Sequence, residues 1–270
     1  MQPDWPAWRA RAPIAPIAPL LPLLADLPRE RWPDHADWSA AARARGVCNA
    51  RGLPIRFVPP SVPPPSALAF EERVLERGEV ETRAACWHDA FHACAWLSFP
   101  RTKAAINALH VAEGLDDAPN GRSVVRNLLT LLDEGGLIVA AADAELVGLA
   151  RAFRWHELFW VQRERVRRTM DFAIIGHALN ERTLGMDFGA TGRALFFTAD
   201  SALLAASPAV RLAWMDAQTA AFLADPARIA ATGRLQPVPI NGIPGWNDAN
   251  MDETYYLDTR QFRPGRRKAA

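Results

Sequence analysis

Two apolar runs near the middle of the chain constrain its fold more than any other feature. Asn127–Asp133 and Leu137–Ala142 are rich in leucine, isoleucine and valine, and Asp133-Glu134-Gly135-Gly136 joins them. Two such runs around a glycine-containing turn are typical of a β-hairpin. Asp133 and Glu134 are then explained as turn residues. We therefore expect a small antiparallel hairpin sheet.

Helical patterns cover most of the remaining chain, so the sequence predicts a helix-dominated α+β domain with that small hairpin sheet. From Leu235 the chain is irregular but apolar, and we expect this extended C-terminal segment to pack on the core, with Asp258 or Arg260 making buried polar contacts. The expected helices are Ser66–Arg77, Arg83–Leu97 capped by Thr82, Pro100–Glu113, Asp143–Arg168, Gly176–Leu184 and Pro208–Leu223, and the expected strands are Ile55–Val58 and Ala194–Thr198. Phe172–Ile175 fits either a strand or a continuing helix.

The domain boundaries follow from composition. Residues 1–54 are expected to form an N-terminal helical arm, residues 55–264 the main domain, and residues 265–270 a basic tail. Within the arm, prolines recur at every third position of Pro13–Leu24, which favours an extended polyproline-like segment over a signal-peptide helix.

Charge and cysteine content narrow the function classes. The net charge is +1, so nucleic acid is a disfavoured partner, and no apolar stretch is long enough to span a membrane. Three cysteines without a C-x-x-C pattern indicate a reducing compartment, and we expect a cytoplasmic protein with a small-molecule ligand. The sequence leaves the oligomeric state open.

One lysine stands out against this composition. Of the 31 basic residues 29 are arginine, and of the two lysines Lys268 lies in the tail while Lys103 lies inside the chain. An ammonium is more compact than a guanidinium and shifts its pKa readily when it is buried. Lys103 is therefore a candidate site residue, and the alternative is chance retention on a helix surface.

Histidines at helical spacing form the densest polar cluster. In the string WHDAFH, His88 and His92 lie one helical turn apart on one face, a spacing that suits two ligands of one metal ion. Asp89 could act as a base or orient an imidazole. Hydrogen bonds within an aromatic-rich core are the structural alternative.

Two further groups share this kind of spacing. His177 and Glu181 also stand at i, i+4, and two facing helices could combine both pairs into one site. Lys103, Asn107 and His110 follow one helix face and could bind an anionic or carbonyl group, although a solvated face is the alternative.

Four segments together resemble a bacterial family catalogued as a domain of unknown function, number 3025. They occur in the family's order, and the resemblance extends from about Ile55 to Pro264. In that family the position of His92 is often asparagine, which implies that His88 with Asp89 is the more dependable part of the cluster. The segments are WHDAFHACAWLSFPRTKAAINALH, LLTLLDEGGLIVAA, GHALNERTL and INGIPGWNDANMDETYYLDTRQFRP.

Two functions fit these residues. The first is a metal-assisted hydrolase for a small polar substrate, with a divalent ion such as zinc on His88 and His177, completed by His92 or Glu181. Asp89 or Glu181 would be the general base, and Lys103, with Asn107 on the same helix face, would stabilise negative charge. The second is a non-catalytic binding or scaffold protein in which the same polar groups tie helices together.

Overall fold

The computed structural model describes residues 3–10, 15–114, 123–185, 189–232 and 235–265. The N-terminal half contains α1 (Trp5–Arg9), α2 (Leu21–Leu24), α3 (His35–Ala44), β1 (Arg56–Val58), α4 (Ala67–Arg77), β2 (Glu79–Glu81), α5 (Trp87–Ser98), α6 (Pro100–Glu113) and α7 (Val124–Gly135). The C-terminal half contains β3 (Gly136–Ala141), α8 (Ala144–Arg151), α9 (Arg163–Thr169), β4 (Met170–Ile174), α10 (His177–Thr183), β5 (Thr191–Thr198), α11 (Ser201–Ala205), α12 (Pro208–Leu223), α13 (Pro226–Thr232) and β6 (Gln236–Pro239). Short 3₁₀-helices lie at Ala15–Leu20, Ile240–Gly242, Asp248–Met251 and Glu253–Leu257, and a π-helical turn lies at Glu157–Val161.

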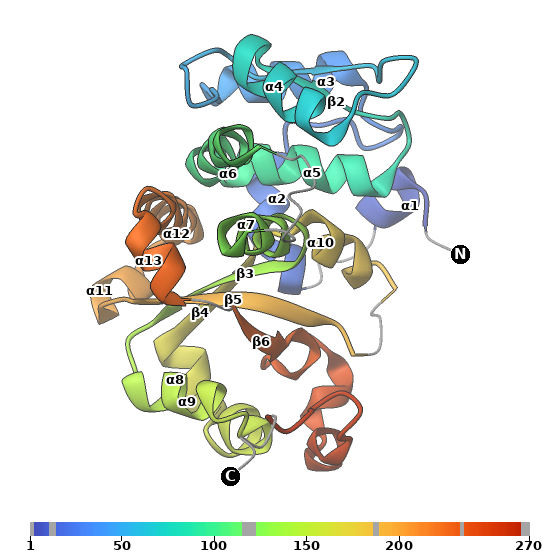
Figure 1. Cartoon of the computed structure of the whole chain (residues 1–270). Coiled ribbons are helices and arrows are strands. Elements are labelled where there is room, and N and C mark those ends of the chain that lie inside the picture. Colours follow the sequence, from blue (N-terminus) through green and yellow to red (C-terminus); the bar gives the residue numbers. More distant parts are fainter. Residues whose placement is uncertain (1–2, 11–14, 115–122, 186–188, 233–234, 266–270) are drawn as a thin grey trace.

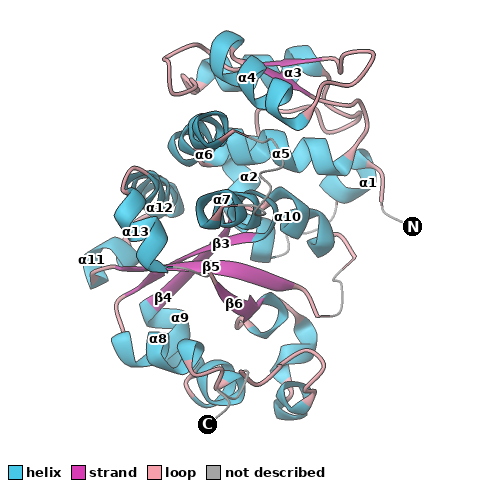
Figure 2. Cartoon of the chain, viewed as in Figure 1, coloured by secondary structure: helices cyan, strands magenta, loops and turns pink. Residues whose placement is uncertain are grey.

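A four-stranded sheet divides the lower part of the molecule, and its strand order is β4-β3-β5-β6 (Figure 2). β3 pairs antiparallel with β4 and parallel with β5, and β6 pairs antiparallel with β5. The helix-dominated α+β class is thus confirmed, but the sheet is mixed rather than purely antiparallel. A second, smaller sheet joins β1 and β2 in parallel.

Alternate residues of β3 face two different cores, because side chains alternate along a strand. Leu137 and Val139 join a core with α8, α9 and the C-terminal segment. Ile138 and Ala140 join a core with α6, α7 and α12. Figure 1 shows these layers on opposite sides of the sheet. In the described part of the chain, every helix is too short or too polar to cross a membrane.

The predicted hairpin is wrong, because its first half is helix α7. Leu128, Leu129 and Leu132 are buried, a spacing that places them on one helix face. The Ser123 hydroxyl caps the helix by accepting from the Arg126 backbone N–H at 3.0 Å. The chain passes from Gly135 straight into β3 without a turn.

Two glycines make this direct passage possible and bring α7 to α10. A Cβ on Gly136 would lie 2.2 Å from the Leu132 carbonyl oxygen, and a Cβ on Gly176 would lie 2.6 Å from the Glu134 carbonyl oxygen. Neither position has room for a larger residue. The C-terminal end of α7 therefore meets the N-terminal end of α10.

The predicted helix over Asp143–Arg168 is also wrong, because it consists of three pieces. α8 ends at Arg151, a π-helical turn covers Glu157–Val161, and α9 follows. Phe153 adopts a φ of 58°, a left-handed conformation that breaks the helical path. The break lets Trp155 and Phe159 become buried in the core below the sheet.

The N-terminal arm packs closely rather than extending as polyproline. Ala15–Leu20 forms a 3₁₀-helix and α2 follows, so within the described residues the three-residue proline repeat matches a helix of three residues per turn. Trp5, Trp8 and Trp38 are buried in a core shared with Trp87 and Phe91 of α5. Apart from Gly265, the predicted tail at 265–270 lies outside the described residues.

The C-terminal segment packs on the core, as predicted. Ile240, Ile243, Trp246, Tyr256 and Phe262 are buried. The prediction that Asp258 or Arg260 makes the buried polar contacts is wrong, since the two side chains pair with each other and that of Arg260 is 78% exposed. Asn241, Asn250 and Gln261 are the buried polar residues of this segment.

We predict that Asn250→Ala will lower the free energy of unfolding by about 2–4 kcal/mol. The fully buried Asn250 amide donates to the carbonyls of Asn241 (2.9 Å) and Ile243 (2.8 Å) and accepts from Arg163 (3.0 Å). Alanine would leave these groups unpaired. Denaturant unfolding measures the change, and Asn127→Ala, at an exposed position of α7, is the control. Equal effects of the two substitutions would contradict the assignment.

Candidate metal centre

Helix α5 presents its two histidines on a different face from Trp87 and Phe91. Trp87 and Phe91 pack into the N-terminal core, while His88 and His92 face a cavity of about 380 Å³. The helix begins at Trp87, so the predicted start at Arg83 with a Thr82 cap is wrong. Asp89 explains the difference, because it accepts from the Arg83 backbone N–H (2.6 Å) and guanidinium (2.8 Å) and holds residues 83–86 outside the helix.

His88 and His177 meet across two helices, as the sequence predicted for facing pairs. Their Nε2 atoms are 3.0 Å apart, and a Glu134 Oε2 lies 3.3 Å from His177 Nε2. The other ring nitrogen of His88, Nδ1, lies 3.3 Å from Glu181 Oε2. His177 is buried, whereas the side chain of His88 is 37% exposed. The pair therefore joins the interior to the cavity.

Lys103 is buried next to a carboxylate, at only 3% exposure. Its ammonium forms a short ion pair with Asp133 and donates to His92 Nε2 at 2.9 Å. Burial alone would raise the pKa of Asp133, but the Lys103 charge holds that pKa below its usual range. Burial first, and the ammonium second, lower the pKa of His92 well below its ordinary value, so this imidazole is neutral.

Among the residues that the structure describes, two sets of side chains place ligand atoms close enough for one metal ion, and both contain His177. The outer set is His88, Glu134 and His177; the inner set is His92, Asp133 and His177. Lys103 contacts two members of the inner set, so a cation already occupies that position. Burial lowers the pKa of His177, which keeps its imidazole available as a neutral ligand.

The remaining predicted residues lie nearby but have other partners. Asp89 lines the cavity. Burial alone would raise the pKa of its carboxyl group, but the hydrogen bonds from Arg83 lower that pKa below its ordinary value. Asn107 is buried and donates to the backbone carbonyl (2.8 Å) and Oε2 (2.7 Å) of Glu71. His110 is buried as well, and its burial lowers its pKa. The face that carries Lys103, Asn107 and His110 is thus internal rather than solvated.

Sequence reasoning missed three carboxyl groups of the site. The expected hairpin makes Asp133 and Glu134 turn residues, although the leucine spacing of α7 contains the signal that places them at a helix end. Glu71 follows Phe70 on the cavity-facing side of α4, and burial raises its pKa to about 7. No motif marks Glu71, because the side chains that enclose it come from other helices.

We predict strong coupling between Lys103 and Asp133. Lys103→Met should lower the free energy of unfolding by about 3–5 kcal/mol, because it leaves a buried carboxylate without its counter-charge. Adding Asp133→Asn to that variant should restore part of the loss. Arg31→Met, which breaks the exposed pair with Asp37, should cost less than about 1 kcal/mol. Additive effects in denaturant unfolding would contradict the coupling.

We predict that Glu71 makes stability fall with rising pH. The folded pKa is about 7 and the unfolded one about 4.3, so the folded chain binds this proton more tightly between those values. The contribution of Glu71 to the free energy of unfolding then decreases as pH rises through that window. Glu71→Gln should remove the decrease and be more stable than the parent at pH 8, on the order of 1–3 kcal/mol. Thermal or urea unfolding between pH 4 and 8 tests this.

The matched control for Glu71 is Glu72→Gln on the exposed side of the same helix. It should keep the pH dependence of the parent. The buried histidines, whose pKa values are lowered, contribute a slope of the opposite sign, so the comparison between parent and variant is decisive. Parent and Glu71→Gln profiles that run parallel between pH 4.5 and 7 would contradict the assignment to Glu71.

Comparison with known proteins identifies the family. The family described as Protein of unknown function (DUF3025) matches residues 55–266, which include every residue of both ligand sets. No curated protein and no solved structure matches the chain. The chain therefore belongs to the DUF3025 family.

Proposed function

We propose that the protein is a metal-assisted hydrolase that binds one divalent transition metal ion, such as zinc, at His88, His177 and Glu134. The observation that carries the proposal is the convergence of these three side chains from α5, α10 and the end of α7. Three segments that lie far apart in the sequence supply a ligand set of two imidazoles and one carboxylate. That set is the one found in several hydrolytic zinc sites.

The separations of the ligand atoms fit a single small ion. Tetrahedral zinc with bonds of about 2.1 Å has neighbouring ligand atoms about 3.4 Å apart. His177 Nε2 lies 3.0 Å from His88 Nε2 and 3.3 Å from Glu134 Oε2. Glu181 would hold His88 through its Nδ1 atom, which orients the imidazole as outer carboxylates commonly do. Glu181 thus supports the site from behind His88 rather than ligating directly.

The outer set leaves a coordination position toward the cavity. The side chains of His88 and Glu134 are 37% and 48% exposed, so a fourth ligand could be water. A divalent ion lowers the pKa of a bound water and so supplies hydroxide near neutral pH. A cavity of about 380 Å³ suits a small substrate.

Proton transfer in this proposal involves Glu71. It lines the same cavity, and its pKa of about 7 matches the exchange of a proton near neutral pH. As a carboxylate it would take a proton from the attacking water and return it to the leaving group. Asp89, the base expected from sequence, would instead hold Arg83 at the cavity rim, where a guanidinium can bind a polar substrate group.

A metal-free polar cluster is the second candidate. A direct hydrogen bond between the His88 and His177 Nε2 atoms also fits their 3.0 Å separation. Lys103, Asn107 and Asp89 all have protein partners. In that case the site would tie helices together in a binding or scaffold protein.

We predict about one transition metal ion per chain in untagged protein purified without chelator. His88→Ala, His177→Ala and Glu134→Gln should each lose most of the metal, because each removes one ligand. Elemental analysis measures the content. His156→Ala is the matched control, since His156 also pairs with a glutamate, Glu253, but lies outside the site.

A metal-free parent that gains no thermal stability with added zinc, manganese or iron would favour the scaffold function. Metal that persists in His88→Ala but not in His177→Ala would place the ion in the inner set and overturn the outer assignment. Hydrolysis of p-nitrophenyl acetate and p-nitrophenyl phosphate, compared between metal-loaded parent and Glu71→Gln, tests the proton-transfer role.

A further inference from the structure

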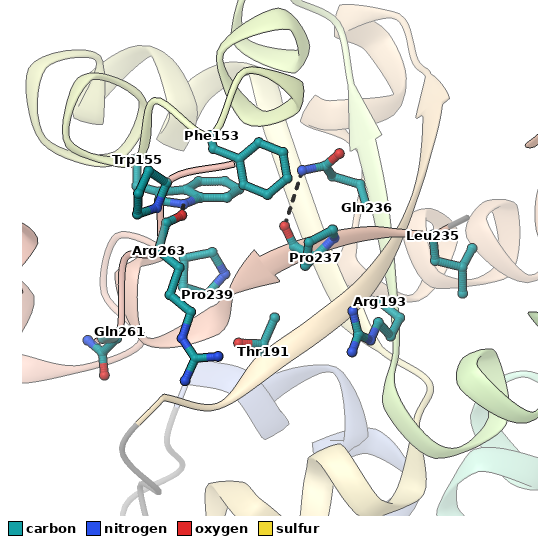
Figure 3. Close-up of a pocket in the computed structure, with 11 residues that line it drawn as sticks. Phe153, Trp155, Thr191, Arg193, Leu235, Gln236, Pro237, Pro239, Gln261 and Arg263 are labelled. Carbon is teal, nitrogen blue, oxygen red and sulfur yellow. Dashed lines mark hydrogen bonds between the residues drawn. The ribbon is translucent and has the colours of Figure 1, made fainter. Parts of the chain in front are cut away.

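A second cavity, of about 610 Å³, lies at the edge of the four-stranded sheet and shares no lining residue with the candidate metal centre. It is enclosed by β5, β6, the segment after α8 and the C-terminal segment (Figure 3). Its volume is in the range of small-molecule sites. Neither the family assignment nor the proposed hydrolase uses it.

Two cross-strand pairs build one wall of this cavity. Arg193 is the register partner of Pro237, and Thr191 is the register partner of Pro239. Since directly opposed residues share a sheet face and alternate residues along a strand do too, these four side chains lie on the same face. The proline rings lack N–H groups and give this wall a rigid, apolar surface next to a guanidinium.

Aromatic rings line the cavity from the other side of the edge strand β6. Phe153 and Trp155 pack with the core that Leu137 and Val139 face, whereas Arg193 lies on the sheet face of Ile138. Phe153 and Trp155 pack edge to face with their centroids 5.5 Å apart, and Figure 3 shows both rings beside the cavity. Phe153 holds a left-handed φ of 58°, a conformation that bulky residues rarely adopt without a reason. Trp155 Nε1 donates to the Arg263 carbonyl at 2.9 Å, and so fixes the backbone that carries the second arginine. The walls are therefore formed before any ligand binds.

The charge of the cavity is positive and unbalanced. Arg193 and Arg263 lie on either side of Thr191 in Figure 3. Among the described residues, neither guanidinium has a carboxylate within ion-pair distance, and the described lining contains no aspartate or glutamate. Elsewhere Arg83, Arg165 and Arg211 all pair with acidic side chains. Arg263 Nε donates to the Arg260 carbonyl at 3.1 Å, but this backbone contact does not neutralise its charge. Two guanidinium groups without an acidic partner among the described residues, next to an apolar wall, can bind an anion that carries a ring.

We propose that this cavity binds an organic anion in which a flat apolar group carries a carboxylate or a phosphate. The Arg193 and Arg263 guanidinium groups bind the anionic group. The Phe153 and Trp155 rings and the two prolines cover the apolar group, which gains by burial and by ring contacts.

Isothermal titration calorimetry on the full chain tests the proposal with three probes that share one ring system: 1-naphthoate, 1-naphthyl phosphate and the neutral 1-naphthalenemethanol. We expect one site per chain and at least about tenfold tighter binding of an anion than of the alcohol. Tighter binding of the phosphate than of the carboxylate would identify a phosphorylated ligand, and the reverse order a carboxylate.

Variants locate the binding site. Arg193→Gln and Arg263→Gln should each reduce the preference for the anion about tenfold, whereas Arg51→Gln, which removes the same charge from an exposed position in the N-terminal part, should keep it. Phe153→Ala should weaken all three probes alike. Arg193→Lys retains the positive charge. If it keeps the preference for the anion, the loss of that preference in Arg193→Gln is not a folding defect.

Absence of binding at millimolar probe would overturn the proposal, as would a preference for the anion that survives both glutamine substitutions. Equal affinity for anion and alcohol in the parent would show that the arginines do not bind the probe, and would overturn it too. Because none of these residues touches the candidate metal centre, the result is independent of the metal analysis.

Discussion

The buried Lys103 ammonium is the charge around which the candidate site is arranged. A cation at 3% exposure is stable only if anionic and hydrogen-bonding groups replace its water. Asp133 and His92 supply these groups, and they come from α7 and α5. The need to balance one charge on α6 thus fixes how three helices meet. Glu134 follows Asp133 directly, so the same arrangement brings it to His177.

This arrangement separates the polar cluster into two parts with different properties. In the inner part the ammonium takes the place that a metal ion would need. Its charge lowers the pKa of Asp133 against the effect of burial, while burial first and this charge second lower the pKa of His92. The outer part, His88, His177 and Glu134, has no ammonium and is open to the cavity. A shared histidine links them. Protonation of His177, or its coordination to a metal ion, therefore changes the electrostatic environment of both parts.

Helical periodicity predicted the pieces of this site, whereas its assembly depends on contacts that periodicity does not encode. The i, i+4 pairs and the composition argument singled out His88, His177 and Lys103, and the structure places all three in one polar cluster. The apolar run before Asp133 fits strand and helix alike, and burial of Leu128, Leu129 and Leu132 against the sheet decides for helix. The helix predicted over Asp143–Arg168 is interrupted because Phe153 has a positive φ angle. Phenylalanine rarely adopts such an angle, so the residue type does not indicate the interruption. Glu71 acquires its high pKa from neighbours on other elements.

The folded core includes residues that precede the start of the family match. The match begins at residue 55, yet Trp5, Trp8 and Trp38 fill the core behind α5, and Trp87 Nε1 donates to the Pro3 carbonyl at 2.8 Å. Helix α5 therefore has a back surface supplied by sequence outside the shared region and a front surface that carries the two histidines. A substitution among the first 54 residues can therefore shift the position of His88 without altering any residue of the candidate site.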